Sequence, residues 1–229
     1  YIRRRQLTEA AKLLVFSKMP ILQVALAAGY ESQQAFGSIF RDMYKQTPLE
    51  YREKETFYPL QLPFSLHRTP SAPDAAALHV SYARREDIPD WMELAALVID
   101  GFPCFEEAEH LEWLKGQIAQ EQALLVRDQE ILAGAAAFSR QTGSIDFLGV
   151  HPQYRRHGIG KIFLDFIVSS LSAGQKISIT TFREGDRADT GQRACYRQLG
   201  FAEAELLTEF GYPTQRLVLR EGWEESKDA

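Results

Sequence analysis

The chain has few cysteines and no long apolar run. Its 229 residues include two cysteines, Cys104 and Cys195, which lie far apart and match no metal-binding or redox spacing. This argues against a disulfide framework and favours a reducing, cytoplasmic setting. No apolar stretch approaches the roughly 18 residues that a membrane helix needs, and no secretory signal is visible. We therefore expect no membrane partner and no metal.

The charge of the chain is unevenly distributed. Residues 1–57 carry nine Lys and Arg against six Asp and Glu, a charge of +3, whereas the remainder carries 17 against 25, a charge of −8. The formal net charge of −5 therefore joins a basic amino-terminal part to an acidic remainder. This asymmetry predicts two domains with different partners.

Prolines mark the expected boundary between these domains. Four of them lie between Tyr58 and Pro73 without sustained periodicity, which is typical of a semi-rigid linker or strap. We predict a domain at 1–57, a linker at 58–77, a second domain at 78–222 and a tail at 223–229. Because the sequence opens at Tyr1 within a charged helical pattern, we expect it to be a piece of a longer protein.

The first domain has the pattern of a helical bundle. Apolar residues recur at helical spacing from Leu7 to Val15, Pro20 suits the first turn of a helix over 21–28 that Gly29 ends, and Ser32 can cap a helix through Tyr44. A last short helix begins at Thr47-Pro48, with Tyr51 directed inward. On the third helix one apolar stripe is predicted, formed by Ala35, Phe36, Ile39, Phe40 and Met43.

Two short helices, a glycine turn and a third helix with outward glutamines predict a helix-turn-helix. Gln33 and Gln34 carry the side-chain amides that can bond base edges in a major groove, with Ser38 and Arg41 on the same outward face. Basic residues could contact phosphates: Arg3, Arg4, Arg5, Lys18, Arg41 and Lys45. The alternative is that any three-helix bundle has such a stripe and such charges.

Three stretches of this part carry a family resemblance. Residues 1–7 (YIRRRQL), 20–36 (PILQVALAAGYESQQAF) and 46–52 (QTPLEYR) resemble the AraC/XylS family of transcription regulators over about residues 1–54. The resemblance corresponds to the connecting helix and the second of the family's two helix-turn-helix units, and it implies DNA contacts from Gln33, Gln34, Ser38 and Arg41. Gly37-Ser38 and Lys45 depart from the family pattern, which implies weak DNA binding by this piece alone.

The second domain alternates between strands and helices. The predicted strands are His79–Ala83, Ala123–Arg127, Ile131–Ser139, Ser144–Val150, Lys176–Phe182, Ala202–Thr208 and Thr214–Leu219. The predicted helices are Asp87–Ile99, Glu107–Glu121, Gly158–Ser172 and Gly191–Leu199. The fold class is therefore α+β with two domains: a small all-α bundle followed by a mixed α/β domain that is antiparallel at its start and has crossover helices later.

The loop at 150–160 (VHPQYRRHGIG) stands between a predicted strand and a predicted helix. Its glycines and the helix start present backbone N–H groups in one direction, which suits a phosphate or pyrophosphate. The spacing fits neither a Walker loop nor a dinucleotide fingerprint.

With its flanks, this loop resembles the GNAT acyltransferase family. The motifs are residues 148–160 (LGVHPQYRRHGIG) and 194–201 (ACYRQLGF), and the resemblance covers about residues 78–220. It implies acetyl-CoA or another acyl-CoA as cosubstrate, held by the loop and by the free backbone of a splayed strand. The implied cofactor-binding residues are Leu148, Val150, Arg155, Arg156, His157, Gly158, Ile159, Gly160, Asp189 and Tyr196. Asp189 replaces a common asparagine, which puts cofactor affinity in question.

The resemblance also implies roles in acyl transfer. The Val150 N–H is the implied oxyanion donor and Tyr196 the implied acid for the leaving thiolate; the alternative for Tyr196 is core packing beside Leu199 and Phe201. Asp146 is a candidate base through water, against a surface carboxylate. Of the two loop histidines, His151 is expected to be structural and His157 to face solvent or a phosphate. The acceptor site is expected around Phe102, Cys104, Phe105, Glu106 and Glu107, against a solvated helix face.

Together these features predict a transcription regulator that binds DNA through residues 1–54 and acetylates an amine, either a small molecule or a protein lysine. The alternative is a non-catalytic regulator that senses acyl-CoA. A third reading is a fold that has lost CoA and serves as an interaction surface. The cytoplasm is the expected compartment, and a homodimer is left open.

Overall fold

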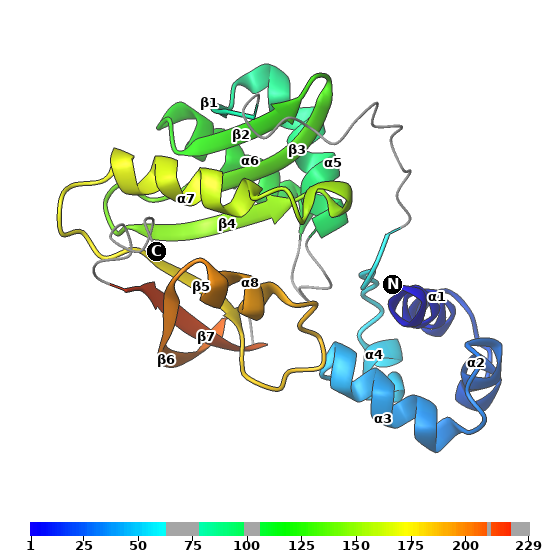
Figure 1. The fold of residues 1–229 in the computed structure, drawn as a ribbon. Coiled ribbons are helices and arrows are strands. Elements are labelled where there is room, and N and C mark those ends of the chain that lie inside the picture. Colours follow the sequence, from blue (N-terminus) through cyan, green and yellow to red (C-terminus); the bar gives the residue numbers. More distant parts are fainter. Residues whose placement is uncertain (63–77, 99–105, 210–211, 221–229) are drawn as a thin grey trace. The chain divides into compact units, whose positions relative to one another are not determined.

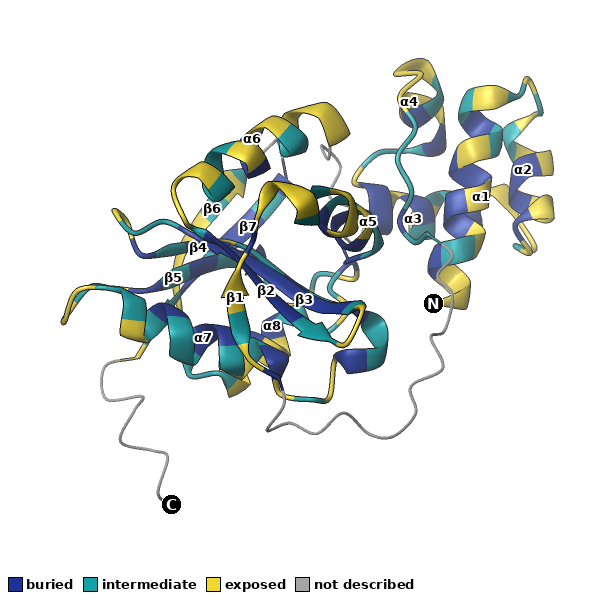
Figure 2. Ribbon diagram, turned by 90° about the horizontal axis from the view of Figure 1, so that it is seen from above, coloured by how far each residue is buried: buried dark blue, intermediate teal, exposed yellow. Residues whose placement is uncertain are grey.

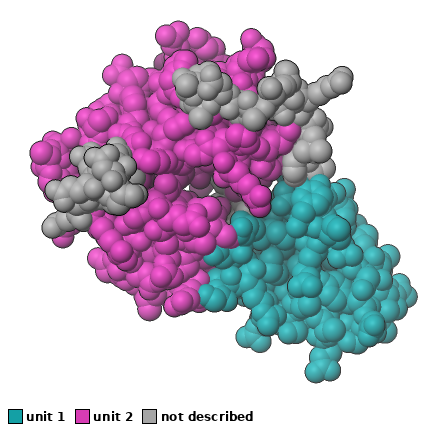
Figure 3. All heavy atoms as spheres, viewed as in Figure 1, with its two compact units in different colours: residues 1–64, 99–105, 185–190 teal, residues 65–98, 106–184, 191–229 magenta. Residues whose placement is uncertain are grey.

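A computed structural model describes residues 1–62, 78–98, 106–209 and 212–220. The chain forms two compact units, which Figure 3 colours separately. Unit 1 comprises residues 1–64, 99–105 and 185–190, and unit 2 comprises residues 65–98, 106–184 and 191–229. The segment 185–190 therefore belongs by its contacts to the unit formed by the amino-terminal residues. The predicted domain bounds at 57/58, 77/78 and 222/223 stay a prediction.

Unit 1 is a bundle of short helices, as the hydrophobic spacing predicts. Its helices are α1 (Ile2–Phe16), α2 (Ile21–Ala27), α3 (Gln33–Tyr44) and α4 (Pro48–Glu53). The core is apolar and aromatic, and it includes the fully buried Leu7 and Leu14 of α1. Phe40 stacks on Tyr44 with centroids 4.4 Å apart, and Tyr51 meets Tyr44 edge-on at 4.8 Å. Such offset and edge-to-face pairs are the favoured arrangements of aromatic rings.

The turns of unit 1 follow from their residues. The Ser32 hydroxyl accepts a hydrogen bond from the Ala35 N–H at 3.1 Å and caps α3. Gly29, at φ 81°, ends α2 in a left-handed conformation. Thr47 and Glu50 cap α4 reciprocally. The expected stripe of α3 needs one correction: Ala35 is exposed, because it lies in the first turn, ahead of the buried Phe36.

The residues after α4 pack back onto α1. Leu60 is buried at 1% exposed, and its N–H donates to Oγ1 of Thr8 at 3.0 Å. The Thr8 hydroxyl in turn donates to the Arg4 carbonyl at 2.9 Å. Tyr58 donates its N–H to the Tyr51 hydroxyl at 3.0 Å. Residues 58–62 are therefore part of the bundle.

Unit 2 is built on a mixed sheet, and Figure 1 shows its strands. Its strands are β1 (Val80–Tyr82), β2 (Ala123–Asp128), β3 (Ile131–Phe138), β4 (Ser144–Val150), β5 (Ser178–Phe182), β6 (Phe201–Glu209) and β7 (Tyr212–Leu219). The order in the described sheet is β1-β2-β3-β4-β5-β7-β6, antiparallel throughout except for the parallel pair β4–β5. This confirms the predicted mixed α/β class.

Helices cover both faces of this sheet (Figure 2). They are α5 (Ile88–Val98), α6 (Glu107–Ala119), α7 (Ile159–Ser170) and α8 (Gln192–Gln198). Figure 2 shows α5 and α6 on one face and α7 and α8 on the other. One apolar cluster joins α7 and α8 to the sheet, including Phe163 and Ile167 of α7 with Tyr196 of α8. Burial of this cluster on folding is the main source of the unit's stability.

Candidate functional sites

The strand β4 separates from β5 along most of its length. The parallel register between them joins Ser144 to Ser178 and Ile145 to Ile179, whereas β4 pairs with β3 as far as Val150. In the described chain the two central strands therefore diverge after Ile145. The His151 N–H donates to the Ala133 carbonyl at 2.9 Å, on the β3 side. Because successive N–H groups on a strand point to opposite edges, those of Val150 and Leu148 point to the side from which β5 has diverged.

A bulge in β4 brings Asp146 out of the ladder. Phe138 pairs with Ile145 and Ala137 pairs with Phe147, so Asp146 is the extra residue. Its side chain reaches solvent, yet the surrounding protein partly desolvates the carboxyl, which raises its pKa, while a hydrogen bond from Ser144 opposes the shift. A carboxyl with a raised pKa holds and releases protons closer to neutral pH than an ordinary aspartate does.

The loop after β4 leads into α7 through a left-handed glycine. A short 3-10 turn, Pro152–Tyr154, follows His151, and Gly158 takes φ 72° at the N-cap of α7. The first hydrogen bonds of the helix run from the N–H groups of Lys161 and Ile162 to the Gly158 carbonyl, at 2.9 and 3.1 Å. The first-turn N–H groups ahead of them therefore remain directed out of the helix end, where the helix dipole is positive.

An anchor beneath this loop was not predicted from the sequence. Tyr154 is buried, and its hydroxyl donates to Oδ2 of Asp128 at 2.8 Å, which ties the loop to the β2–β3 hairpin. Its ring lies 5.7 Å from that of His157, whose Nδ1 is buried and makes no hydrogen bond among the described residues. His151 is buried, and its Nδ1 accepts from the Gln153 N–H at 3.3 Å, consistent with a structural role.

Other predicted ligand residues lie around the loop. Arg155, Arg156 and Gly158 are exposed, so two cations stand beside the open helix end. A Cβ on Gly158 would meet nothing within 4 Å, and one on Gly160 would come to 3.4 Å from Leu199. The space over Gly158 is thus open enough for a ligand to approach the backbone, whereas Gly160 faces Leu199.

Gly134 on β3 lets α7 approach the sheet. A Cβ at this position would lie 2.7 Å from Cγ2 of Ile159 and 3.0 Å from Cε2 of Phe163. The glycine therefore fixes how closely the first turn of α7 sits on β3. The sequence signal for it, a single glycine within an apolar strand, was present but carried no specific prediction.

Tyr196 and Asp189 fall in different surroundings. Tyr196 is 8% exposed, and its ring meets Phe201 edge-on at 6.3 Å, so the core contact expected as its alternative role is present. Asp189 lies in the segment 185–190, which belongs to unit 1. Of the predicted acceptor residues, Phe102, Cys104 and Phe105 lie outside the described residues, and Glu106 and Glu107 begin α6 with exposed side chains.

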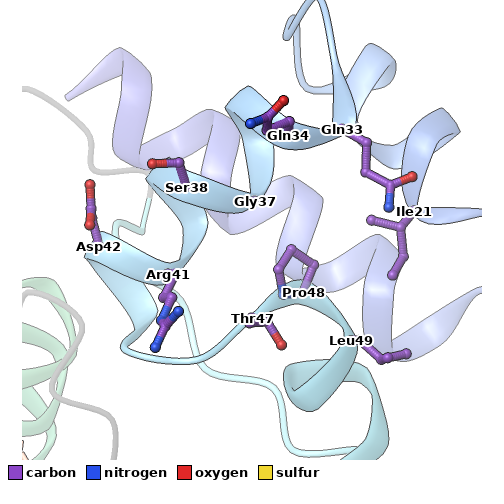
Figure 4. A pocket seen from close by; sticks show the side chains of 10 residues that line it. All are labelled: Ile21, Gln33, Gln34, Gly37, Ser38, Arg41, Asp42, Thr47, Pro48 and Leu49. Atoms are coloured by element: carbon purple, nitrogen blue, oxygen red, sulfur yellow. The ribbon is translucent and has the colours of Figure 1, made fainter.

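The predicted DNA-binding residues line one hollow on α3 (Figure 4). Gln33, Gln34, Ser38 and Arg41 are all exposed and border an open space of about 780 Å³ together with residues at the start of α4. Gly37 lies between them, and a Cβ there would meet nothing within 4 Å. The four side chains are thus brought together on one face of the helix, as the spacing predicts.

Two features are absent from the described residues. Among the described residues, no three His, Cys, Asp or Glu side chains come together in a way that could hold a metal ion. In that same part of the chain, no helix has the length and apolar character required to span a bilayer.

Comparison with protein families identifies both parts. Residues 93–212 match the model of an acetyltransferase (GNAT) domain, more than half of the chain. The chain belongs to the GNAT family. Residues 1–54 match the model of a helix-turn-helix domain, which confirms the AraC-type resemblance of this part.

Relatives of the helix-turn-helix part are transcription regulators by name. The chain is 45% identical over 56 residues to the probable transcription factor PqrA of Proteus vulgaris, covering 24% of this chain and 46% of that protein. It is 43% identical over 54 residues to the regulatory protein SoxS of Escherichia coli K12, covering 24% and 50%. The chain thus spans about half the length of these curated relatives.

The GNAT part also resembles solved structures. A GNAT acetyltransferase from Streptococcus agalactiae superposes with a TM-score of 0.51 at 13% identity, covering 63% of this chain and 96% of that one. At this identity the likeness concerns the fold alone.

Proposed function

We propose that the chain is a transcription regulator whose GNAT unit binds acetyl-CoA and transfers its acetyl group to an amine. The observation that carries the proposal is the divergence of β4 and β5 next to the open first turn of α7. The gap exposes backbone donors to an extended arm, and the helix end offers N–H groups and a positive dipole to a pyrophosphate. Arg155 and Arg156 add charge beside it. The proposal places the protein in the cytoplasm, where acetyl-CoA and DNA are both present.

The transfer requires little from the protein. The acceptor nitrogen bonds to the thioester carbonyl carbon, the oxyanion forms, and the carbon–sulfur bond then breaks. In the proposal, the Val150 N–H stabilises the oxyanion. The thiolate takes its proton from the Tyr196 hydroxyl. The nitrogen loses its proton through water to Asp146, whose raised pKa suits that task.

The helix-turn-helix would bind DNA through α3. Gln33 and Gln34 supply paired amide donors and acceptors for base edges, and Arg41 supplies a cation for a phosphate. A Cβ on Gly37 would meet nothing within 4 Å, so a groove wall could approach the helix backbone at this position.

The first test is titration calorimetry of the chain with acetyl-CoA. We expect micromolar binding, abolished in Gly158→Glu, which places an anion where the pyrophosphate would lie. The matched control is Gly174→Glu, because Gly174 also has a left-handed φ, 79°, with nothing within 4 Å of a Cβ, yet lies after α7. Absence of binding by the parent chain, with no heat at two different temperatures, would exclude an acyl-CoA site.

A second candidate function is sensing without catalysis. It is favoured by Asp189, which is an anionic group where the family has an asparagine. By its contacts Asp189 belongs to unit 1. Release of CoA thiol from acetyl-CoA across a panel of amines discriminates the two functions. Turnover that falls in Tyr196→Phe without loss of acetyl-CoA affinity supports the enzyme, and tight binding without turnover for every acceptor supports the sensor.

A further inference from the structure

The segment 185–190 leaves unit 2 after β5, joins unit 1, and returns to unit 2 at the start of α8. Within unit 1, Arg4 binds it from α1. Arg4 is 7% exposed, and its Nη1 donates to the Ala188 carbonyl at 3.0 Å while its Nε and Nη2 donate to the Leu60 carbonyl at 3.2 Å. One buried guanidinium thus joins two chain segments that are far apart in sequence.

Two ion pairs bind the same segment to α3 and its C-cap. The Lys45 ammonium lies 2.9 Å from Oδ1 of Asp186, whose side chain is 7% exposed. That carboxylate also accepts the Ala188 N–H at 2.8 Å. Arg187 pairs with Asp42 at 2.6 Å, in a more exposed position. The more exposed pair is screened by solvent and contributes little to stability.

The other end of this stretch is fixed within unit 2. Arg193, in the first turn of α8, is 6% exposed, and its Nη1 donates to the Phe182 carbonyl at 3.1 Å and to Oε1 of Gln215 at 2.7 Å. Its Nη2 pairs with Glu203 at 2.5 Å. Ala188 is thus held in unit 1 and Arg193 in unit 2, and five residue steps span at most roughly 17 Å. The covalent connection between these two anchored residues is therefore short.

We infer that residues 185–190 couple the helix-turn-helix to the acyl-CoA site, so that occupancy of the site changes the order of α1 and α3. The inference rests on the proposed function for the ligand and adds the segment that transmits its binding. α8 carries Tyr196, three residues after Arg193, and packs with the first turn of α7 in one cluster. An acyl-CoA bound to α7 and α8 restricts the motion of the first residues of α8. Residues 188–193 pass that restriction to Arg4 and Asp186, which hold Ala188. Coupling is reciprocal, so DNA bound to α3 changes acetyl-CoA affinity by the same factor.

Hydrogen exchange of the full chain with and without acetyl-CoA tests this coupling. We expect acetyl-CoA to slow exchange both at residues 155–160 and in α1 and α3, the latter by roughly fivefold, the low end of typical couplings. The double variant Asp186→Asn, Arg187→Gln removes both ion pairs. It should keep the slowing at 155–160 and lose it in α1 and α3.

The matched control is Arg84→Gln, Glu86→Gln, which removes one cation and one anion from an exposed pair in unit 2. It should behave as the parent. Protection at 155–160 without any change in α1 and α3 of the parent overturns the coupling and leaves the proposed function standing. An unchanged response in the double variant overturns the role of this segment. No protection at 155–160 overturns the proposed acyl-CoA binding and the coupling with it.

Discussion

The indole Nε1 of Trp91 donates a hydrogen bond to Nε2 of His110 across 3.2 Å, joining α5 to α6. Phe147 of β4 packs against both rings, with centroids 5.2 Å from Trp91 and 5.7 Å from His110. The bond requires a lone pair on Nε2, so the imidazole is neutral with its proton on Nδ1. Burial lowers the pKa of His110 to about 4, which keeps it neutral at physiological pH.

This histidine should make unit 2 less stable in mild acid. The unfolded chain binds a proton on His110 near pH 6.5, whereas the folded chain does so only near pH 4. The stability that the neutral His110 gives to unit 2 is therefore fully present above pH 6.5 and is lost as the pH falls from 6.5 to 4. Because His110 is only half-buried and solvent screens part of the effect, we expect a loss of about 2 kcal/mol. Urea unfolding followed by tryptophan fluorescence at a series of pH values measures it.

His110→Gln is the control for this pH dependence. Its amide oxygen can still accept from Trp91 but takes up no proton in this range. The difference in unfolding free energy between pH 6.5 and 4 should shrink in the variant. An equal pH dependence in the two proteins would show that other groups cause it.

Tyr154→Phe should loosen the loop before α7. The change removes the 2.8 Å hydrogen bond to Asp128 while keeping the buried ring, and we expect a loss of about 1 kcal/mol. Acetyl-CoA affinity should fall with it. Tyr82→Phe is the matched control, because it removes a 3.0 Å bond from Arg140 at an exposed ring. Equal effects of the two variants on acetyl-CoA affinity would argue against an anchoring role.

Gly134→Ala should displace the first turn of α7. The added methyl would lie 2.7 Å from Ile159, and overpacking of this kind costs about 1–3 kcal/mol. In addition to this loss of stability, titration calorimetry should show weaker acetyl-CoA binding. Gly116→Ala in α6 serves as control, because its methyl meets nothing within 4 Å and should stabilise the helix by up to about 1 kcal/mol. Unchanged acetyl-CoA affinity in Gly134→Ala would contradict the link between α7 placement and binding.

Gly37→Ala should stabilise unit 1 by about 1 kcal/mol, since Gly37 lies within α3 and a Cβ there meets nothing. The near-ultraviolet circular dichroism of the tyrosine cluster reports unfolding of this unit. Gly29→Ala should do the opposite, because its φ of 81° strains any residue with a Cβ. A destabilised Gly37→Ala would reveal a packing role that the structure lacks.

Local sequence patterns were enough to predict most elements of this fold. The period of the apolar residues predicted each described α-helix and β-strand. Turn chemistry predicted several of their ends, as at Ser32, Gly29 and Thr47. The loop at 150–160 followed from its glycines and its place between a strand and a helix. These features depend on residues a few positions apart, so a single sequence contains the necessary signal.

Features that depend on distant residues were not predictable in this way. The bulge at Asp146 arises from the register between two strands, and the Tyr154–Asp128 bond joins positions 26 residues apart. The bond between Arg4 and Ala188 spans 184 positions, and in the sequence Arg4 resembled any other cation of a basic helix. Neither spacing nor composition distinguishes a buried arginine from its exposed neighbours.

The passage of residues 185–190 through unit 1 also limits how the two units can be exchanged. A recombination event that replaced the codons for residues 1–62 with those of another regulator would supply new helices but would leave Ala188 and Asp186 encoded elsewhere in the gene. The incoming helix would then need an arginine equivalent to Arg4 and a cation equivalent to Lys45 to receive them. The helix-turn-helix of this chain thus cannot be exchanged independently of residues 185–190. Substitutions at Lys45 and Asp186 should therefore occur together.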